Sequence, residues 1–155
     1  MFLSESKFQN VIMHTPLISL DLIVLGEDGN ALLGKRLNQP AKGFWFVPGG
    51  RVLKNESIAN AFRRLTLNEL GIELELSKAE LLGPYDHFYN ESVFDDKIKT
   101  HYVAIAYIIK LTNRQLSRLP LNEQHSEYSW FKLGELLNSP AVHKHTKWYF
   151  EALTE

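Results

Sequence analysis

The segment at 49–72 constrains the fold more than any other, because glycines bracket a helical pattern there. Two adjacent glycines follow FWFV, a short strand pattern, and glycine allows backbone geometry that a side chain would forbid. Apolar residues then recur at helical spacing until Gly71, which suits a left-handed helix end. Either Asn55 or Ser57 is placed to cap the helix start. The segment therefore predicts a short strand, a glycine turn and one amphipathic helix.

Strand patterns account for most of the remaining chain. The apolar run at 17–25 is typical of a strand and carries one acid, Asp21, and an EDGN turn then leads to ALLGKR. GPYDHFYN and HYVAIAYIIKL follow the helix, and YSWFK precedes a terminal helix around HKHTKWYFEAL. A short helix capped by Ser4 is predicted to end at Pro16. This alternation predicts one mixed α/β sandwich, a single domain that spans residues 1–155.

Composition narrows the class of protein. With 155 residues, 45% of them hydrophobic, the chain is long enough for one buried core. The absence of cysteine excludes a disulfide scaffold and fits a cytoplasmic location. Its 17 basic and 18 acidic residues argue against a broad nucleic-acid surface, though not against a local cationic pocket. The apolar runs fall well short of the roughly 20 residues that cross a membrane, so we expect neither a nucleic-acid nor a membrane partner.

The glycine-bracketed segment resembles the Nudix hydrolase signature, which reads G, five residues, E, seven residues, R-E-U-x-E-E-x-G-U, with U a bulky aliphatic. The matching residues are Gly50, Glu56, Arg64, Glu69, Gly71 and Ile72. Two glutamates of the signature are replaced by Leu65 and Asn68, and its first aliphatic is replaced by Thr66. The resemblance implies a Nudix-type α/β/α sandwich with a mixed sheet. The lost acids leave a degenerate binding domain without catalysis as an alternative.

A wider resemblance covers residues 2–150. The segments SLD, LLGKR, WFVPGGRV, RLT, HFY, HYV and NEQH are similar to the GDP-mannose mannosyl hydrolases, a Nudix subfamily. This resemblance implies Mg²⁺-dependent hydrolysis of GDP-mannose or GDP-glucose to GDP and free sugar, by attack of water on the anomeric carbon with inversion. It also implies a homodimer with an interface that includes the N-terminal segment. The alternatives are a conventional Nudix pyrophosphohydrolase that releases GMP and sugar phosphate, and a nucleotide-sugar binding module without turnover.

The resemblance assigns a general base and the metal ligands. His125 matches the base, and an imidazole pKa of about 6.5 suits proton abstraction near neutral pH. One Mg²⁺ ion per site is implied, held by the Glu69 carboxylate, the side-chain oxygen of Gln124 and the backbone carbonyl of Gly49. Because only one of these ligands is a carboxylate, we expect the ion to bind mainly together with the diphosphate, which supplies further oxygens.

Two arginines are predicted to hold the diphosphate. Arg36 ends a strand pattern and Arg51 follows the glycines, and a planar guanidinium can donate paired hydrogen bonds to phosphate oxygens. Because they would neutralise the charge of the leaving GDP, both arginines are candidate catalytic residues. The resemblance also implies that Arg64 pairs with Glu56 and holds the loop against the helix.

Four further residues match family positions that line the sugar and phosphate site: Asp21, His87, Tyr89 and Tyr102. Strand periodicity places His87 and Tyr89 on the same face. Asp21 is a candidate catalytic residue, because it can accept hydrogen bonds from sugar hydroxyls or stabilise positive charge at the anomeric carbon. From the residues alone, Asp21 fits equally well as an exposed acid on an edge strand.

The terminal helix pattern is interpreted as packing. His143 and His145 are two positions apart, so on a helix they point to different sides, which argues against a metal site. Trp148 and Tyr149 are predicted to pack the helix against the sheet rather than to stack on guanine.

Overall fold

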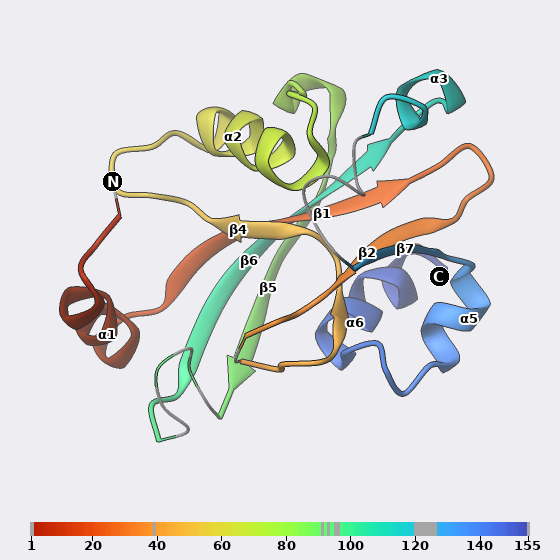
Figure 1. Ribbon diagram of the computed structural model, residues 1–155. Coiled ribbons are helices and arrows are strands. Elements are labelled where there is room, and N and C mark those ends of the chain that lie inside the picture. Colours follow the sequence, from red (N-terminus) through yellow and green to blue (C-terminus); the bar gives the residue numbers. More distant parts are fainter. Residues whose placement is uncertain are drawn as a thin grey trace.

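The protein is a sheet covered by helices on both faces (Figure 1). The computed structural model describes residues 2–38, 40–90, 92, 94, 97–119 and 127–154. These residues form a mixed sheet made of β1 (Leu17–Leu25), β2 (Ala31–Lys35), β3 (Trp45–Phe46), β4 (Gly49–Arg51), β5 (Glu80–Tyr89), β6 (Thr100–Lys110) and β7 (Tyr128–Phe131). The helices are α1 (Glu5–His14), α2 (Ile58–Leu70), α3 (Asn113–Leu116), α5 (Leu133–Asn138) and α6 (Lys144–Leu153), with a 3-10 turn, η1 (Leu76–Lys78). The predicted α/β/α sandwich with a mixed sheet is confirmed.

Strand β1 lies inside the sheet. Along one edge it pairs in parallel with β6 over its whole length. Its other edge is divided, because β4 pairs with Ser19–Asp21 whereas β2 starts to pair only at Leu25 and continues beside β3 and β7. Asp21 therefore has a neighbouring strand on each side, with Gly49 and Ala106 as its partners. The alternative of an acid on an edge strand is wrong.

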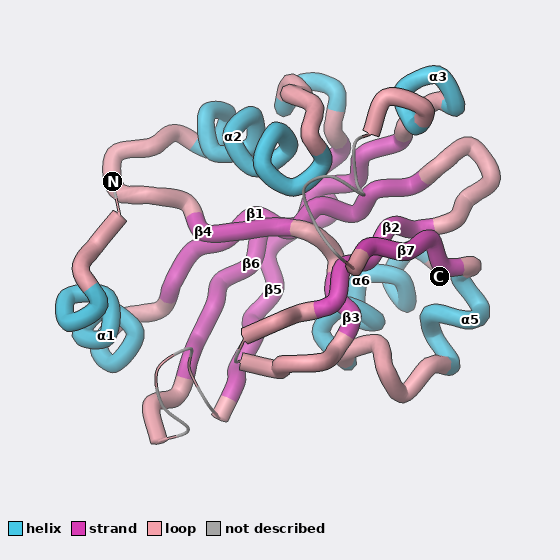
Figure 2. Tube along the Cα trace, viewed as in Figure 1, coloured by secondary structure: helices cyan, strands magenta, loops and turns pink. Residues whose placement is uncertain are grey.

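Each face of the sheet has its own core, as strand alternation requires. Leu20, Leu22 and Val24 of β1 pack with apolar residues of α2. Ile23, from the opposite face of the same strand, belongs to a second cluster that includes Tyr149 and other residues of α5 and α6. Figure 2 shows α2 and α6 on opposite sides of the strands. Positions 19, 21 and 23 of β1 thus face α6 rather than α2.

The ends of the helices follow local sequence signals. The Ser4 hydroxyl accepts the Lys7 N–H, and α1 ends at His14, two residues before Pro16. The Ser57 hydroxyl caps α2 by accepting the Asn60 N–H, so Ser57 rather than Asn55 is the cap. Gly71 ends α2 at φ 79°, which confirms the left-handed end. Within the described ranges, every helix is too short or too polar to cross a membrane.

The two glycines at the start of the signature do not form the predicted turn. Both belong to strand β4, and their value lies in close approach rather than in left-handed backbone. A Cβ atom on Gly49 would lie 2.3 Å from the carbonyl oxygen of Leu20, and one on Gly50 would lie 2.6 Å from Cδ2 of Leu65. Glycine here lets β4 lie tightly between β1 and α2.

Candidate active site

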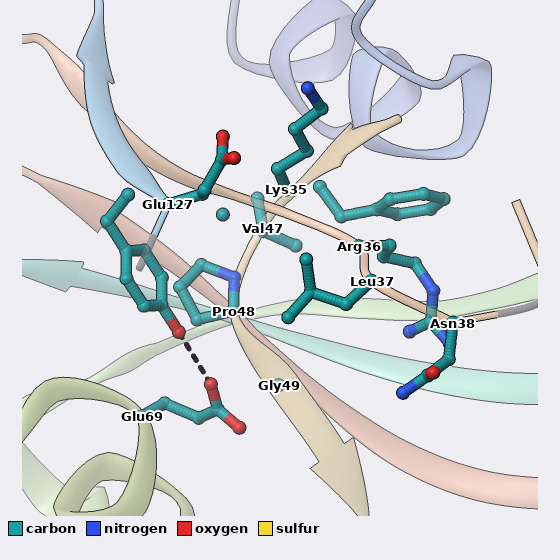
Figure 3. Close-up of a pocket in the computed structure, with 12 residues that line it drawn as sticks. Lys35, Arg36, Leu37, Asn38, Val47, Pro48, Gly49, Glu69 and Glu127 are labelled. Carbon is teal, nitrogen blue, oxygen red and sulfur yellow. Dashed lines mark hydrogen bonds between the residues drawn. The ribbon is translucent and has the colours of Figure 1, made fainter. Parts of the chain in front are cut away.

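A cavity of about 560 Å³ lies where β2 and β4 separate. Its wall includes Glu69 from α2, Gly49 from β4 and Tyr128 from β7 (Figure 3). The Tyr128 hydroxyl donates a hydrogen bond to Oε2 of Glu69 at 2.6 Å. Burial and the neighbouring Glu69 raise the pKa of Tyr128, so its hydroxyl stays protonated. The hydrogen bond therefore orients the Glu69 carboxylate at the cavity wall.

The carbonyl of Gly49 faces away from β1. The Leu22 N–H donates to the Pro48 carbonyl at 2.8 Å, so position 48 bonds to β1. Successive residues of an antiparallel strand direct their backbone groups to opposite sides, so positions 49 and 51 point away from β1. Arg51 follows this pattern, because its carbonyl accepts a hydrogen bond from Arg64 at 2.7 Å. The Gly49 carbonyl is directed to that same side.

Two of the three predicted metal ligands, the Glu69 carboxylate and the Gly49 carbonyl, thus line one cavity. Both are hard oxygen donors of the kind that Mg²⁺ accepts. Among the described residues, no three His, Cys, Asp or Glu side chains gather in a way that could hold a metal ion. The two oxygen donors at this cavity, Glu69 and Gly49, fit an ion that takes its remaining ligands from a bound diphosphate. The third ligand, Gln124, and the predicted base, His125, lie outside the described residues.

A smaller cavity of about 100 Å³ adjoins the first. The two cavities share wall residues, namely Arg36, Phe46, Val47 and Gly49. All residues predicted for the sugar and phosphate site line the smaller one: Asp21, Arg36, Arg51, His87, Tyr89 and Tyr102. The register explains this, because partners across strands share a face, and Asp21 is opposite Gly49 while His87 is opposite Tyr102. The expectation that His87 and Tyr89 share a face is met by the cavity wall.

Asp21 is held on the α6 face of the sheet. The Tyr149 hydroxyl donates a hydrogen bond to its Oδ2 at 2.5 Å and lies 3.2 Å from Nε2 of His87. Burial raises the pKa of Asp21 to about 6, while the hydrogen bond from Tyr149 and the attraction of Arg36 act in the opposite direction. The carboxylate is therefore mostly ionised at pH 7 and able to accept hydrogen bonds or face positive charge.

A stack of histidines lies beside this acid. The His145 ring stacks on His87, with centroids 4.4 Å apart and planes 8° apart. His143 lies against His145, with centroids 4.5 Å apart. The prediction that His143 and His145 point to different sides is wrong, because His143 caps α6 and does not take helical geometry. Burial lowers the pKa of His145 to about 3 and that of His87 to about 4, so both rings are neutral at physiological pH.

The two predicted phosphate ligands meet at the smaller cavity. Arg36 is exposed, and its Nε donates to the Pro40 carbonyl at 2.8 Å. The Arg51 guanidinium lies over the Phe8 ring of α1, 3.9 Å from its centroid. Arg36, Arg51 and Phe8 also line a third cavity of about 220 Å³. The smaller cavity therefore combines two guanidinium donors with the carboxylate of Asp21.

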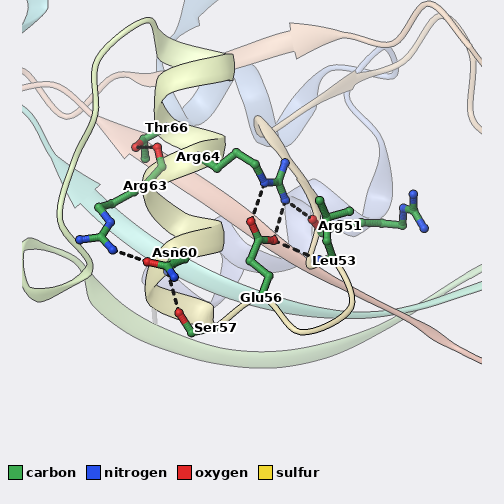
Figure 4. Close-up of polar contacts among 8 residues, drawn as sticks. All are labelled: Arg51, Leu53, Glu56, Ser57, Asn60, Arg63, Arg64 and Thr66. Atoms are coloured by element: carbon green, nitrogen blue, oxygen red, sulfur yellow. Dashed lines mark hydrogen bonds and ion pairs between the residues drawn. The ribbon is translucent and has the colours of Figure 1, made fainter. Parts of the chain in front are cut away.

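The signature loop is held by an ion pair (Figure 4). Arg64 of α2 donates to both carboxylate oxygens of Glu56, at 2.7 and 2.9 Å. The same carboxylate accepts the Leu53 N–H at 3.0 Å, and Arg64 also bonds to the Arg51 carbonyl. The hydrogen bond with Arg64 lowers the pKa of Glu56. The predicted pair is present and fixes the loop that leads from β4 to α2.

The departures from the signature have distinct places. Leu65 is buried in the core between α2 and the sheet, where it packs against Gly50. Thr66 is also buried, and its hydroxyl accepts the Leu74 N–H, tying the end of the helix to the following loop. Asn68 is exposed. Because positions 65 and 68 are not acidic, Glu69 is the carboxylate of α2 that lines the larger cavity.

Sequence reasoning missed Tyr149, Tyr128 and Phe8 as parts of the site. The predicted packing role of Tyr149 is confirmed by its full burial, but its hydroxyl also bonds to Asp21. One usable signal was spacing, since His145 and Tyr149 are four positions apart and share a helix face. Phe8 and Tyr128 come from elements whose contact with the site depends on the whole fold.

Comparison with known proteins assigns the family. A family model described as NUDIX domain matches residues 15–152. The chain belongs to the NUDIX domain family. One relative, the low-salt glycan biosynthesis protein Agl8 of Haloferax volcanii, is 34% identical over 149 residues, which cover 96% of this chain and 89% of that protein.

Solved NUDIX structures share the architecture. The MutT NUDIX hydrolase from Burkholderia pseudomallei is 29% identical with a TM-score of 0.67, covering 89% of this chain and 98% of that one. The MutT protein from Methanosarcina mazei Go1 has a TM-score of 0.69 at 23% identity, covering 91% of this chain and 95% of that one. At that identity the second likeness concerns the fold alone. Membership of the NUDIX family supports hydrolase activity on a nucleotide substrate.

Proposed function

We propose that this NUDIX protein hydrolyses GDP-mannose, or GDP-glucose, to GDP and the free sugar, with one Mg²⁺ ion per site. The proposal is carried by two adjoining cavities of different chemistry. The larger contains Glu69 and the Gly49 carbonyl, which suit a metal with a diphosphate, and the smaller contains Asp21 and His87, which suit hydroxyl groups. Arg36 lies in the walls of both. The name of the Haloferax volcanii relative refers to glycan biosynthesis, which agrees with a substrate that carries a sugar.

The lost signature acids favour attack at carbon rather than at phosphorus. With Leu65 in the core and Asn68 in place of a second acid, fewer carboxylates are left to bind metal and direct water at a phosphate. In the proposed step, the water oxygen bonds to the anomeric carbon while the bond from this carbon to the diphosphate oxygen breaks. GDP leaves with the bonding electrons, and the configuration inverts. His125 is proposed to take the proton of the water.

The other residues divide between the two ends of the substrate. Arg36 and Arg51 are proposed to bind the diphosphate and to neutralise the charge of the leaving GDP. Asp21 and His87, with Tyr89 and Tyr102 beside them, are proposed to surround the sugar. Glu69, Gly49 and Gln124 would hold Mg²⁺, and the bound ion would add positive charge at the diphosphate.

Product analysis in ¹⁸O-labelled water tests the proposal. GDP-mannose is incubated with the protein and Mg²⁺, and the products are examined by mass spectrometry. We expect the label in free mannose and none in GDP, and inversion at the anomeric carbon by NMR. Label in GMP or in mannose phosphate would mean attack at phosphorus and a conventional NUDIX pyrophosphohydrolase. Binding of GDP-mannose without turnover would mean a binding module.

A homodimer is also proposed, from the sequence resemblance alone. Light scattering of the full chain would measure its mass in solution. A monomer at micromolar concentration would contradict this part of the proposal without affecting the chemistry of the site.

A further inference from the structure

Tyr149 links two residues of the smaller cavity that are far apart in the chain. It belongs to α6, is fully buried, and packs edge-on against Tyr85 with ring centroids 4.8 Å apart. Its hydroxyl lies 2.5 Å from Oδ2 of Asp21 and 3.2 Å from Nε2 of His87. A buried hydroxyl between an acid and an imidazole determines which of their atoms carry hydrogen, because each contact needs one donor and one acceptor.

The hydroxyl of Tyr149 has one hydrogen, which settles the direction of both contacts. In the shorter contact the phenol donates to Oδ2 of Asp21, and this uses its single hydrogen. The phenol oxygen is then the acceptor in the contact with His87, and Nε2 of His87 is the donor. A neutral imidazole carries one N–H, so Nδ1 of His87 has none. Hydrogen bonds run in one direction, from His87 through Tyr149 to Asp21.

The protonation states of the two donors agree with this order. Burial, together with the nearby His143, lowers the pKa of His87 to about 4, so the ring is neutral and has a single N–H at pH 7. Burial and the neighbouring Asp21 raise the pKa of Tyr149, so the phenol keeps its hydrogen. His145, stacked on His87, fixes the plane of the ring.

We propose that Tyr149 is a positioning residue that holds His87 as the Nε2–H tautomer and Asp21 in one orientation, so that both offer acceptors to hydroxyl groups of a sugar. The assignment of the sugar to this cavity rests on the proposed function. Nδ1 is the nitrogen of His87 that Tyr149 does not engage. The second carboxylate oxygen of Asp21 faces Gly49, where a Cβ atom would lie within 2.9 Å of it.

This combination of side chains defines the chemistry of the ligand. Asp21 and His87, which supply acceptors, line the same cavity as Arg36 and Arg51, which supply guanidinium donors. A molecule with several O–H donors next to an anionic group satisfies both kinds of partner. An anion placed against Asp21 and an unprotonated Nδ1 would meet no donor there and would be repelled by the carboxylate.

The tautomer is measured by long-range ¹H–¹⁵N correlation NMR on the full chain, labelled at histidine and free of substrate. The spectrum of His87→Asn identifies the His87 signals. We expect the wild-type ring to show a protonated Nε2 and an unprotonated Nδ1, and Tyr149→Phe to shift both nitrogens toward the average of two tautomers. Tyr85→Phe, which removes a hydroxyl from the ring packed against Tyr149, is expected to leave them unchanged. A wild-type ring with hydrogen on Nδ1 would overturn the proposal, even if Tyr149→Phe did not fold.

Kinetics separate the positioning role from the proposed function. For GDP-mannose, Tyr149→Phe is expected to lower kcat by about 10- to 100-fold, the range for losing a hydrogen bond to a charged group, with a smaller change in KM. Tyr85→Phe is expected to keep the wild-type kcat. An unchanged kcat in Tyr149→Phe despite a changed tautomer would overturn the positioning role. If the wild type showed the expected tautomer but no hydrolysis, the proposed function would fail while the tautomer assignment stood.

Discussion

On the α2 face of the sheet, Glu56 and Arg64 form an ion pair that is partly accessible to water. On the α6 face, hydrogen bonds join Asp21, His87 and Tyr149 inside a packed layer. Side-chain exposure is 14% for Glu56 and 27% for Arg64, but Tyr149 is fully buried. A solvent-accessible pair gains modest stability and tolerates acid until its carboxylate is protonated. A buried layer of neutral histidines loses stability as soon as the unfolded histidines start to bind protons. The two halves of one site should therefore respond differently to a change of pH, and also to an added side-chain atom in their packing.

Substitution of the adjacent glycines Gly49 and Gly50 is expected to have the largest effect on stability. Gly50 lies against α2, whereas Gly49 lies against the backbone of β1 beside Asp21. A Cβ atom at Gly49 would meet the backbone oxygen of Leu20 at 2.3 Å, whereas one at Gly50 would meet the flexible end of Leu65 at 2.6 Å. We expect Gly49→Ala to lower the free energy of unfolding by about 3 kcal/mol or more, and Gly50→Ala by about 1–2 kcal/mol, because a side chain can move aside but a paired strand cannot. Urea unfolding measures both.

The control for this pair is Gly134→Ala in α5, where a Cβ atom meets nothing within 4 Å. It should leave stability unchanged or raise it by up to about 1 kcal/mol. Equal losses in Gly49→Ala and Gly50→Ala would mean that β4 can shift away from β1. A rigid, tight fit of β4 against β1 would then be excluded.

Acid provides the second test, aimed at the α6 face. Burial lowers the pKa of His87 to about 4 and that of His145 to about 3, from 6.5. The two neutral rings therefore contribute fully to the free energy of unfolding above pH 6.5, and this contribution is lost as pH falls below 6.5. The pKa of Asp21, raised to about 6 from 3.8, acts oppositely between those two values. In this range the unfolded chain binds two protons at the histidines and the folded chain binds one at Asp21, so the unfolded chain holds about one proton more. The free energy of unfolding should therefore fall by about 1.4 kcal/mol for each pH unit between pH 6 and pH 4.

His145→Phe removes one of the two histidines while keeping a ring stacked on His87. The slope of unfolding free energy against pH should then become nearly flat between pH 6 and pH 4, as measured by urea unfolding at several pH values. An unchanged slope would show that the histidine layer is hydrated and already titrates in the folded protein.

The contacts on the α2 face could be predicted from the sequence, whereas those on the α6 face could not, and the reason is physical. Glu56, Arg64 and Glu69 lie in one loop and helix, inside a contiguous signature, so the family resemblance of that segment implies both the ion pair and the carboxylate at the cavity. Tyr149 is separated from His87 by 62 positions and from Asp21 by 128, and only the pairing of β1, β5 and β6 under α6 brings them together. Local spacing carries no information about such contacts.

Strand patterns show the same limit. The ranges of β1, β5 and β6 were close to those predicted, because alternation and β-branched residues are local signals. The position of β4 was not predictable from those signals, since a three-residue strand with two glycines has little strand propensity and forms because β1 offers an edge. The predicted turn at Gly49 failed for that reason.

The third test addresses the ion pair on the α2 face. The pKa of Glu56 is lowered from 4.5, chiefly by its hydrogen bond with Arg64, so its stabilisation is present above pH 4.5 and is lost as pH falls through the lowered value. Glu56→Gln should lower the free energy of unfolding by about 1 kcal/mol at pH 7, a modest value because the pair is partly exposed. The difference from wild type should shrink as pH falls below 4.5.

Glu75→Gln is the matched control, since Glu75 pairs with Arg63 of the same helix at 3.5 Å but is 60% exposed. Its effect should be within about 0.5 kcal/mol. If Glu56→Gln were equally mild at pH 7, the loop would be held by packing rather than by the ion pair.

The smallest effect concerns Arg51, which belongs to both regions. Its carbonyl bonds to Arg64 in the ion-pair network, whereas its guanidinium rests on the Phe8 ring of α1 at 3.9 Å. An attraction between a cation and an aromatic face is worth about 0.5–1 kcal/mol at exposed sites, so Phe8→Leu should lower kcat/KM for GDP-mannose by about 2- to 5-fold. Phe8→Tyr keeps the aromatic face and should stay near wild type.

Phe2→Leu controls for the loss of an aromatic ring from the N-terminal segment, because Phe2 is 78% exposed. It should leave kcat/KM unchanged. Similar losses in Phe8→Leu and Phe8→Tyr would mean that the shape of the contact, not the aromatic face, holds the guanidinium. In that case Arg51 would be placed by its backbone in β4 and by Arg64, as the α2 face is, and the ring of α1 would only fill space.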